Sequence, residues 1–219
     1  MKKKILSIVL CFALVFGCCA SFTPTVVQAK KFSKKKVKIV KFKPDCYMLP
    51  EDDISVKELL LFINKNKQMA NVKVTVDYFY QKENIDHQEY NLDVAQVGCV
   101  GLGNIESPYD YYKYKISKIK KSKSKQIPKK KVKIKTKKFE KSTKEVTIKN
   151  TSKSNGTFQM VNLFYNKKGK VVYYEATYMM DIKKKKKETA YLNYKPRTYV
   201  GTTVKFKKRK TFYNFVKYK

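Results

Sequence analysis

The chain of 219 residues is predicted to be an all-β protein made of two tandem antiparallel β-sandwich modules. The first observation behind this prediction is a hexapeptide, Lys-Lys-Lys-Val-Lys-Ile, which occurs at residues 34–39 and again at residues 129–134. The second is an alternation of apolar and polar residues with a period of two, in runs rich in β-branched and aromatic residues. Helical patterns are nearly absent. Repetition at this distance indicates one design used twice, with strands in each copy.

The two copies match beyond the hexapeptide. Aligned from it, three alternate residues of the first copy fall on three of the second, namely Leu60, Phe62 and Asn64 on Val146, Ile148 and Asn150. The spacing between matched positions changes along the chain because the first copy carries an insertion near residues 44–55. Insertions of this kind belong in loops between strands, so Cys46 is expected in a loop.

The amino terminus has the parts of a secretory signal peptide. Lys2, Lys3 and Lys4 precede an apolar run over residues 5–16, and Val27-Gln28-Ala29 forms a small-residue cleavage site. We therefore expect export of the chain and cleavage after Ala29. Two alternatives stay open: a lipoprotein signal in which Cys18 carries the lipid, and an uncleaved membrane anchor over residues 5–22.

Cleavage after Ala29 leaves a length that suits two small domains. We predict a signal peptide at residues 1–29, a first module at 30–120, a Lys-rich linker at 121–128 and a second module at 129–219. Only Cys46 and Cys99 remain after cleavage, and in an exported chain they form either a disulfide or two buried thiols. Two cysteines and a single histidine, His87, make no metal site.

Strand patterns recur along the mature chain. The clearest runs are residues 37–42, 72–76 and 132–134. The sequence Asn-Lys-Lys-Gly at residues 166–169 has the composition of a short hairpin loop with glycine at a positive φ, and residues 81–84 take the same place in the first copy. Turns at this spacing predict about six or seven short strands in each module.

A series of motifs in the second copy matches a known family. An Asn-rich loop at residues 150–156 precedes a strand at 158–165, the hairpin sequence Asn-Lys-Lys-Gly follows, and Glu-Thr-Ala stands at 188–190. This arrangement resembles the FxLYD family of small extracytoplasmic modules in bacterial envelope proteins. The name-giving motif reads Asn-Leu-Phe-Tyr-Asn here, and lysines at 184–187 replace the Pro-Gly of the family. The resemblance implies tandem Ig-like β-sandwich modules and offers no catalytic residues to carry over.

Positive charge is concentrated in the second copy. The chain has 51 Lys and Arg against 17 Asp and Glu, a formal net charge of +34 at pH 7. Residues 40–117 carry 9 Lys and 12 acidic residues, whereas residues 128–219 carry 28 Lys plus Arg and 5 acidic residues. Self-repulsion of this strength is most readily tolerated where a polyanion neutralises it. The second module is therefore expected to be the one that binds.

The basic residues best placed for such contact lie at a turn and near the carboxyl terminus. They are Lys183, Lys184, Lys185, Lys186, Lys187, Lys207, Lys208, Arg209 and Lys210. Only two of the 51 basic residues are arginine, and because lysine lacks the planar fork of a guanidinium group, base-specific reading is not expected. Two other interpretations stay open: a solvated lysine-rich surface, and lysines that keep exposed strand edges from pairing.

The sequence contains no motif of an enzyme. It has no Gly-rich phosphate loop, serine elbow or cluster of metal ligands, and its clustered tyrosines are interpreted mainly as cross-strand pairs. We expect a non-catalytic protein of the cell envelope, without a cofactor or small-molecule substrate. Its expected partner is an anionic cell-wall polymer such as teichoic acid, or an anionic membrane surface. The alternatives are a nonspecific nucleic-acid binder and a structural extracellular spacer.

Overall fold

The computed structural model describes residues 31–43, 47–48, 55–56, 58–103, 105, 107–196 and 203–218. The expected signal peptide, including Cys18 and the cleavage site at Ala29, lies outside these residues. In the described ranges, no helix is long and apolar enough to cross a membrane. Residues 32–219 form one compact unit. The predicted division of this unit into two domains is therefore not confirmed, and its two halves are described below by their sheets.

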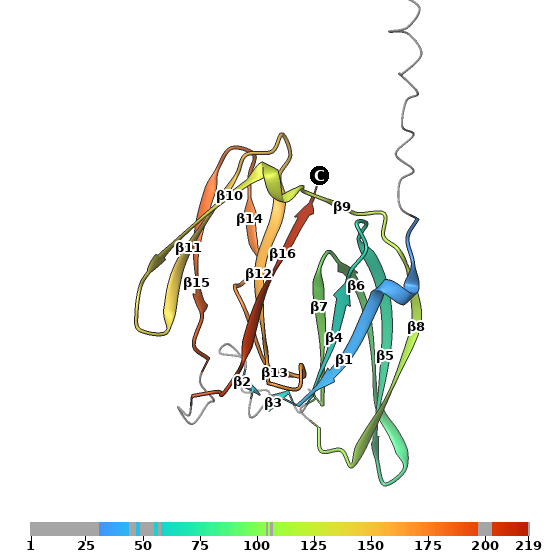
Figure 1. Ribbon diagram of the computed structural model, residues 1–219. Helices are drawn as coiled ribbons and strands as arrows, with labels where there is room; N and C mark the ends of the chain where they lie inside the picture. The colour runs from blue at the N-terminus through green and yellow to red at the C-terminus, as the bar shows by residue number, and fades with distance from the viewer. Residues whose placement is uncertain are drawn as a thin grey trace, which may run out of the picture. The chain divides into compact units, whose positions relative to one another are not determined.

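The described chain is almost entirely antiparallel strand, as predicted, with two short 3-10 helices (Figure 1). The first half contains η1 (Lys34–Lys36), β1 (Val37–Phe42), β2 (Tyr47–Met48), β3 (Ser55–Val56), β4 (Glu58–Asn64), β5 (Ala70–Tyr80), β6 (Glu83–Val94), β7 (Val97–Leu102) and β8 (Tyr111–Lys121). The second half contains β9 (Lys125–Gln126), η2 (Lys129–Lys131), β10 (Val132–Lys138), β11 (Thr143–Asn150), β12 (Gly156–Tyr165), β13 (Val171–Ala176), β14 (Met180–Ile182), β15 (Lys187–Asn193) and β16 (Lys208–Lys217).

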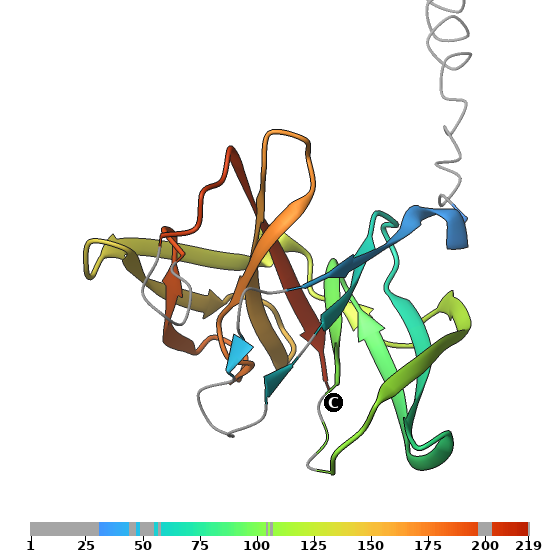
Figure 2. The same ribbon diagram turned by 90° about the horizontal axis from the view of Figure 1, so that it is seen from below.

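Each half pairs its own strands into two main sheets. The first half has the sheets β1-β4-β7 and β6-β5-β8, and the second half has β10-β11-β15 and β13-β12-β16-β9, with β14 also paired to β12. The strands β10 and β11, olive in Figure 2, lie side by side. Among the described strands, none pairs with a strand of the other half. The strand β9 falls in the predicted linker, so that segment extends a sheet of the second half.

The sequence repeat is also a structural repeat. Both copies of the hexapeptide begin with a 3-10 turn and continue into a strand, β1 in the first half and β10 in the second. Val37 then lies opposite Asn64, and Val132 lies opposite Asn150, which confirms the alignment of the two asparagines. The insertion near residues 44–55 holds the small pair β2-β3 and has no counterpart in the second half.

Both predicted hairpin turns are present. Asn166 N–H donates to the carbonyl of Lys170 at 3.0 Å, and Gly169 has a φ of 72°, as expected for that loop. In the first half the turn is shorter, because Gln81 and Lys82 alone connect β5 to β6, with φ values of 48° and 71°. Neither residue is glycine, so this turn adopts a left-handed backbone at some cost in free energy.

Three buried clusters hold the unit together. One fills the space between the two sheets of the first half and includes Leu60 and Phe62 of β4. A second fills the second half and includes Phe158 and Phe215. The third joins the halves, since it contains both first-half and second-half residues: Phe42, Leu59, Leu61, Ile63, Val97, Val161, Leu163 and Phe212.

The strand β4 is the reason that the halves pack closely. Every residue of Glu58–Asn64 is buried, because alternate side chains enter the core of the first half and the shared cluster. A strand buried on both faces has a continuous apolar sequence, here Leu-Leu-Leu-Phe-Ile. The sheet β1-β4-β7 therefore packs through its outer face against the sheet that contains β12 and β16. The opposite sheet of the second half, β10-β11-β15, leaves its outer face to solvent.

Candidate anion-binding surface

The predicted basic turn connects β14 to β15. Lys186 N–H donates to the carbonyl of Lys183 at 3.1 Å, and Lys185 takes a φ of 65° to close the turn. Asn155 supports it, because its side-chain Oδ1 accepts the N–H of Lys184 at 3.0 Å. All five lysines from residue 183 to residue 187 are exposed, so the turn presents them to solvent.

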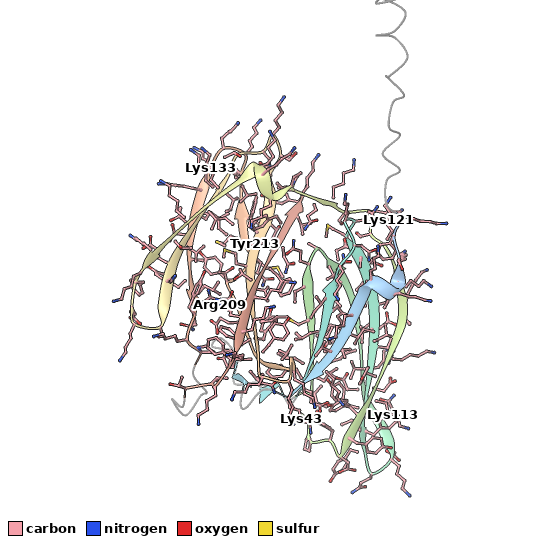
Figure 3. All side chains as sticks on the ribbon, in the orientation of Figure 1. Lys43, Lys113, Lys121, Lys133, Arg209 and Tyr213 are labelled. Atoms are coloured by element: carbon pink, nitrogen blue, oxygen red, sulfur yellow. The ribbon has the colours of Figure 1, made fainter. Side chains whose placement is uncertain are left out.

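A row of three lysines crosses the sheet beside this turn. Lys133 on β10 lies opposite Lys149 on β11, and Lys149 lies opposite Lys187 on β15. Opposite residues on adjacent strands point to the same side, with Cβ atoms about 4.5–5.5 Å apart. All three are exposed, and in the described chain none is within ion-pair distance of a carboxylate. We call Lys133, Lys149 and Lys187 the lysine row (Lys133 is labelled in Figure 3).

The next two rows of the same face are less strongly charged. Lys135 lies opposite Thr147, whose Oγ1 is 3.2 Å from Oγ1 of Thr189 on β15. One step further, Lys137 Nζ forms an ion pair with Glu145 at 3.0 Å. Uncompensated positive charge on this face is therefore greatest at the lysine row, next to a pair of hydroxyl groups that can also donate to an anion.

The turn and the lysine row lie at one end of the second half. Lys185 Nζ is 3.5 Å from the carbonyl of Thr151, the residue after β11, and Thr151 N–H donates to the carbonyl of Lys131 at 2.9 Å. These contacts bring η2, the end of β11 and the basic turn together. We call the lysine row together with residues 183–186 the basic end.

The other predicted cluster lies at the opposite end of the same half. Lys208 pairs with Tyr165 at the last residue of β12, whereas Ile182, just before the basic turn, pairs with Gly156 at the first residue. A strand of this length spans about 30 Å, well beyond the screening length of about 8 Å at physiological ionic strength. Lys207, Lys208, Arg209 and Lys210 therefore form a site separate from the basic end.

Part of this second cluster is already engaged by aromatic rings. The guanidinium carbon of Arg209 lies 4.0 Å from the ring centroid of Tyr194, and Lys210 Nζ lies 4.9 Å from that of Phe212. Arg209 and Lys133, both labelled in Figure 3, come from different sheets of the second half. Lys207 and Lys208 are exposed at the start of β16.

Only one cysteine of the predicted pair, Cys99, lies among the described residues. Cys99 lies on β7, and its Sγ donates to the hydroxyl of Tyr174 at 3.6 Å. Burial raises the pKa of this thiol, which makes it a poor nucleophile. Cys46 lies outside the described residues, so the disulfide stays a prediction.

Two titratable groups with a raised pKa lie away from the basic end. The hydrogen bond to Asp77, at 2.6 Å from Nδ1, raises the pKa of His87 on the exposed face of β6. In the second half, burial raises the pKa of Glu175 to about 7. In the described ranges, no three His, Cys, Asp or Glu side chains are grouped so as to hold a metal ion.

Lys133 and Lys149 were not selected from the sequence. The alignment of the two copies matched Asn64 with Asn150 but set no register within a copy, so the pairing of Lys133 with Lys149 comes from the structure. Lys187 was selected, but as part of a turn rather than as the third member of a row. No protein-family model matches the chain, and no curated protein matches it either.

Proposed function

We propose that this chain is an exported, non-catalytic protein that binds an anionic polymer of the cell envelope, such as teichoic acid, through the basic end. The lysine row is the observation that carries the proposal. Like charges directly opposite one another in a sheet are destabilising. Here three lysines lie side by side, and no carboxylate of the described residues is within ion-pair distance of them. A polyanion laid across the row converts this repulsion into attraction.

The use of lysine favours binding of a flexible polymer over recognition of a specific sequence or geometry. The row and the turn use lysine alone, a compact and strongly hydrated charge that binds anions without fixing their orientation. The turn projects beyond the sheet, so a polymer can contact it without disturbing strand pairing. Export, which the amino-terminal sequence predicts, would place this surface among wall polymers and anionic lipids.

A retention assay on purified cell walls tests the proposal. Walls with and without teichoic acid are incubated with the protein over a salt series, and the bound fraction is measured. We expect retention on the teichoic-acid walls that falls as salt rises, because the contact is electrostatic. The triple variant Lys133→Gln, Lys149→Gln, Lys187→Gln is expected to lose at least tenfold in apparent affinity.

The matched control changes three exposed lysines of β8, in the variant Lys115→Gln, Lys118→Gln, Lys121→Gln. It alters the net charge equally and is expected to stay within about twofold of the parent protein. Equal losses in both variants would show that net charge alone governs retention and would overturn the assignment to the basic end. Tighter binding to duplex DNA than to walls at the same salt would favour the nucleic-acid alternative.

A further inference from the structure

A groove of about 730 Å³ runs between the free edge of β1 and the hairpin of β12 and β13. It lies away from the basic end, and its volume is in the range of known ligand sites. Six consecutive residues of the first half, from residue 38 to residue 43, line one side, so the groove follows the length of β1. The remaining lining residues are Ile63, Lys65, Tyr165, Gly169, Lys170, Val171, Val172 and Lys210.

The edge of β1 that lines the groove has unpaired backbone groups. In the described chain β1 pairs with β4 alone, and the bond from Lys65 N–H to the carbonyl of Lys36 at 2.9 Å fixes the alternation. Residues 38, 40 and 42 then direct their N–H and C=O groups toward β4, while Ile39 and Lys41 direct theirs away from the sheet. An extended chain lying along this edge would find donors and acceptors at the spacing of a strand.

The opposite edge of the same sheet is covered at Val97. There β7 directs the N–H and C=O of Val97 away from β4, and the side-chain amide of Asn214 binds both, at 3.0 and 2.6 Å. The second half thus binds the β7 edge at Val97, whereas among the described strands none pairs with the β1 edge along the groove.

The charge of the groove defines what fits it. Six lysines line it, and no acidic residue is among the described residues around it. Lys41 and Lys43 are held by Glu58, at 2.6 and 3.5 Å. The other four, Lys38, Lys65, Lys170 and Lys210, have no carboxylate within ion-pair distance in the described chain. A second copy of β1 would set lysine against lysine here, so self-pairing is disfavoured.

Apolar side chains complete the lining. Val40 and Phe42 face the shared cluster, and Val171 and Val172 line the far side. A chain of alternating acidic and apolar residues would therefore meet both kinds of surface. We propose that an extended acidic segment of a partner polypeptide adds to the edge of β1 as a further strand, with its carboxylates near Lys38, Lys65, Lys170 and Lys210. This inference is independent of the proposed polymer binding at the basic end.

Fluorescence anisotropy with short peptides tests the proposal on the purified protein. The probe is a labelled octapeptide that alternates Glu and Val, and a Lys–Val octapeptide serves as the charge control. We expect the Glu–Val peptide to bind and the Lys–Val peptide to show no binding. A Glu–Val peptide methylated on every backbone nitrogen keeps its charge but can donate no backbone hydrogen bond from either edge, so its affinity is expected to fall at least tenfold.

Matched variants locate the site. The double variant Lys38→Gln, Lys170→Gln is expected to lower the affinity for the Glu–Val peptide at least fivefold. The control variant Lys183→Gln, Lys186→Gln at the basic end should change that affinity less than twofold. The groove variant should keep the retention of the parent on cell walls, which separates this inference from the proposed function. Unchanged affinity of the methylated peptide, equal losses in both variants, or no binding by the parent would each overturn the strand-addition proposal.

Discussion

The side-chain amide of Asn214 binds the backbone of Val97 as a neighbouring strand would. Its Oδ1 accepts the Val97 N–H at 3.0 Å, and its Nδ2 donates to the Val97 carbonyl at 2.6 Å. The same Oδ1 accepts the N–H of Gln96 at 3.0 Å, and Gln96 Oε1 in turn accepts the N–H of Tyr213 at 2.9 Å. Since Asn214 belongs to β16 and Val97 to β7, these bonds attach the second half to a sheet edge of the first.

Replacing Asn214 by alanine should weaken this attachment. The change leaves the N–H and C=O of Val97 without their partner in a part-buried interface, so we expect a loss of about 1–3 kcal/mol in the free energy of unfolding. Urea unfolding followed by circular dichroism measures it. Asn84→Ala, at an exposed residue of β6, is the control and should stay within about 0.5 kcal/mol. Equal midpoints for the two variants would mean that the Asn214 bonds add nothing.

Glu175 should make stability depend on pH. Burial raises its pKa to about 7 from the usual 4.5 of a glutamate, and Asn193 Nδ2 donates to its Oε1 at 3.1 Å. Because the folded chain holds the proton more tightly than the unfolded chain, this contribution is fully present below pH 4.5 and is lost as the pH rises through 7. Above pH 7 the buried carboxylate is ionised, which costs free energy.

Glu175→Gln should remove this dependence while keeping the shape of the side chain. We expect the stability of the variant relative to the parent to rise by about 1–3 kcal/mol, or several degrees in melting temperature, between pH 5 and pH 8. Thermal melts of both proteins across pH 5–8 provide the measurement. The difference between them isolates Glu175, because every other charge is shared. A constant difference at all pH values would contradict a raised pKa at this residue.

Strands and hairpin turns could be predicted from the sequence, because each depends on residues that are close together in the chain. Alternation marked the strands, and Gly169 marked a turn that needs a positive φ. The repeat matched Asn64 with Asn150, and the structure places each of them opposite the valine of its own hexapeptide. Burial of β4 on both faces was not predicted, because its second partner, the sheet containing Val161 and Leu163, belongs to the other half of the chain.

The candidate surfaces were harder to foresee because they combine distant segments. The lysine row needs the pairing of three strands, so no single stretch of sequence displays it. In the groove, Lys38 and Lys170 meet from opposite halves through the shared cluster, and only the packing of the halves brings them together. The basic turn at residues 183–187 was foreseen because it is contiguous in the chain.

Asn64 and Asn150, which occupy equivalent positions in the two copies, should contribute similarly to stability. Asn64 Nδ2 donates to the carbonyl of Val94 at 3.0 Å, and Asn150 Nδ2 donates to that of Ile182 at 3.0 Å. Each Oδ1 accepts the backbone N–H two residues later, so both side chains hold a corner of their sandwich. Alanine at either position orphans buried groups and should cost about 1–3 kcal/mol in urea unfolding. A loss at only one of them would show that the repeat has diverged in function at this corner.

The turn at Gln81 and Lys82 should become more stable when replaced by Asn-Gly. Both residues hold positive φ, at 48° and 71°, a backbone that glycine and asparagine adopt more easily than Gln or Lys. We expect a gain of about 1 kcal/mol and a melting temperature higher by about 2–4 °C.

Gly169→Ala is the reverse test, since its φ of 72° disfavours alanine although nothing lies within 4 Å of the added Cβ. That variant should lose about 1 kcal/mol by backbone strain alone. A stabilised Gly169→Ala or a destabilised Asn-Gly turn would contradict the left-handed conformation assigned to these residues.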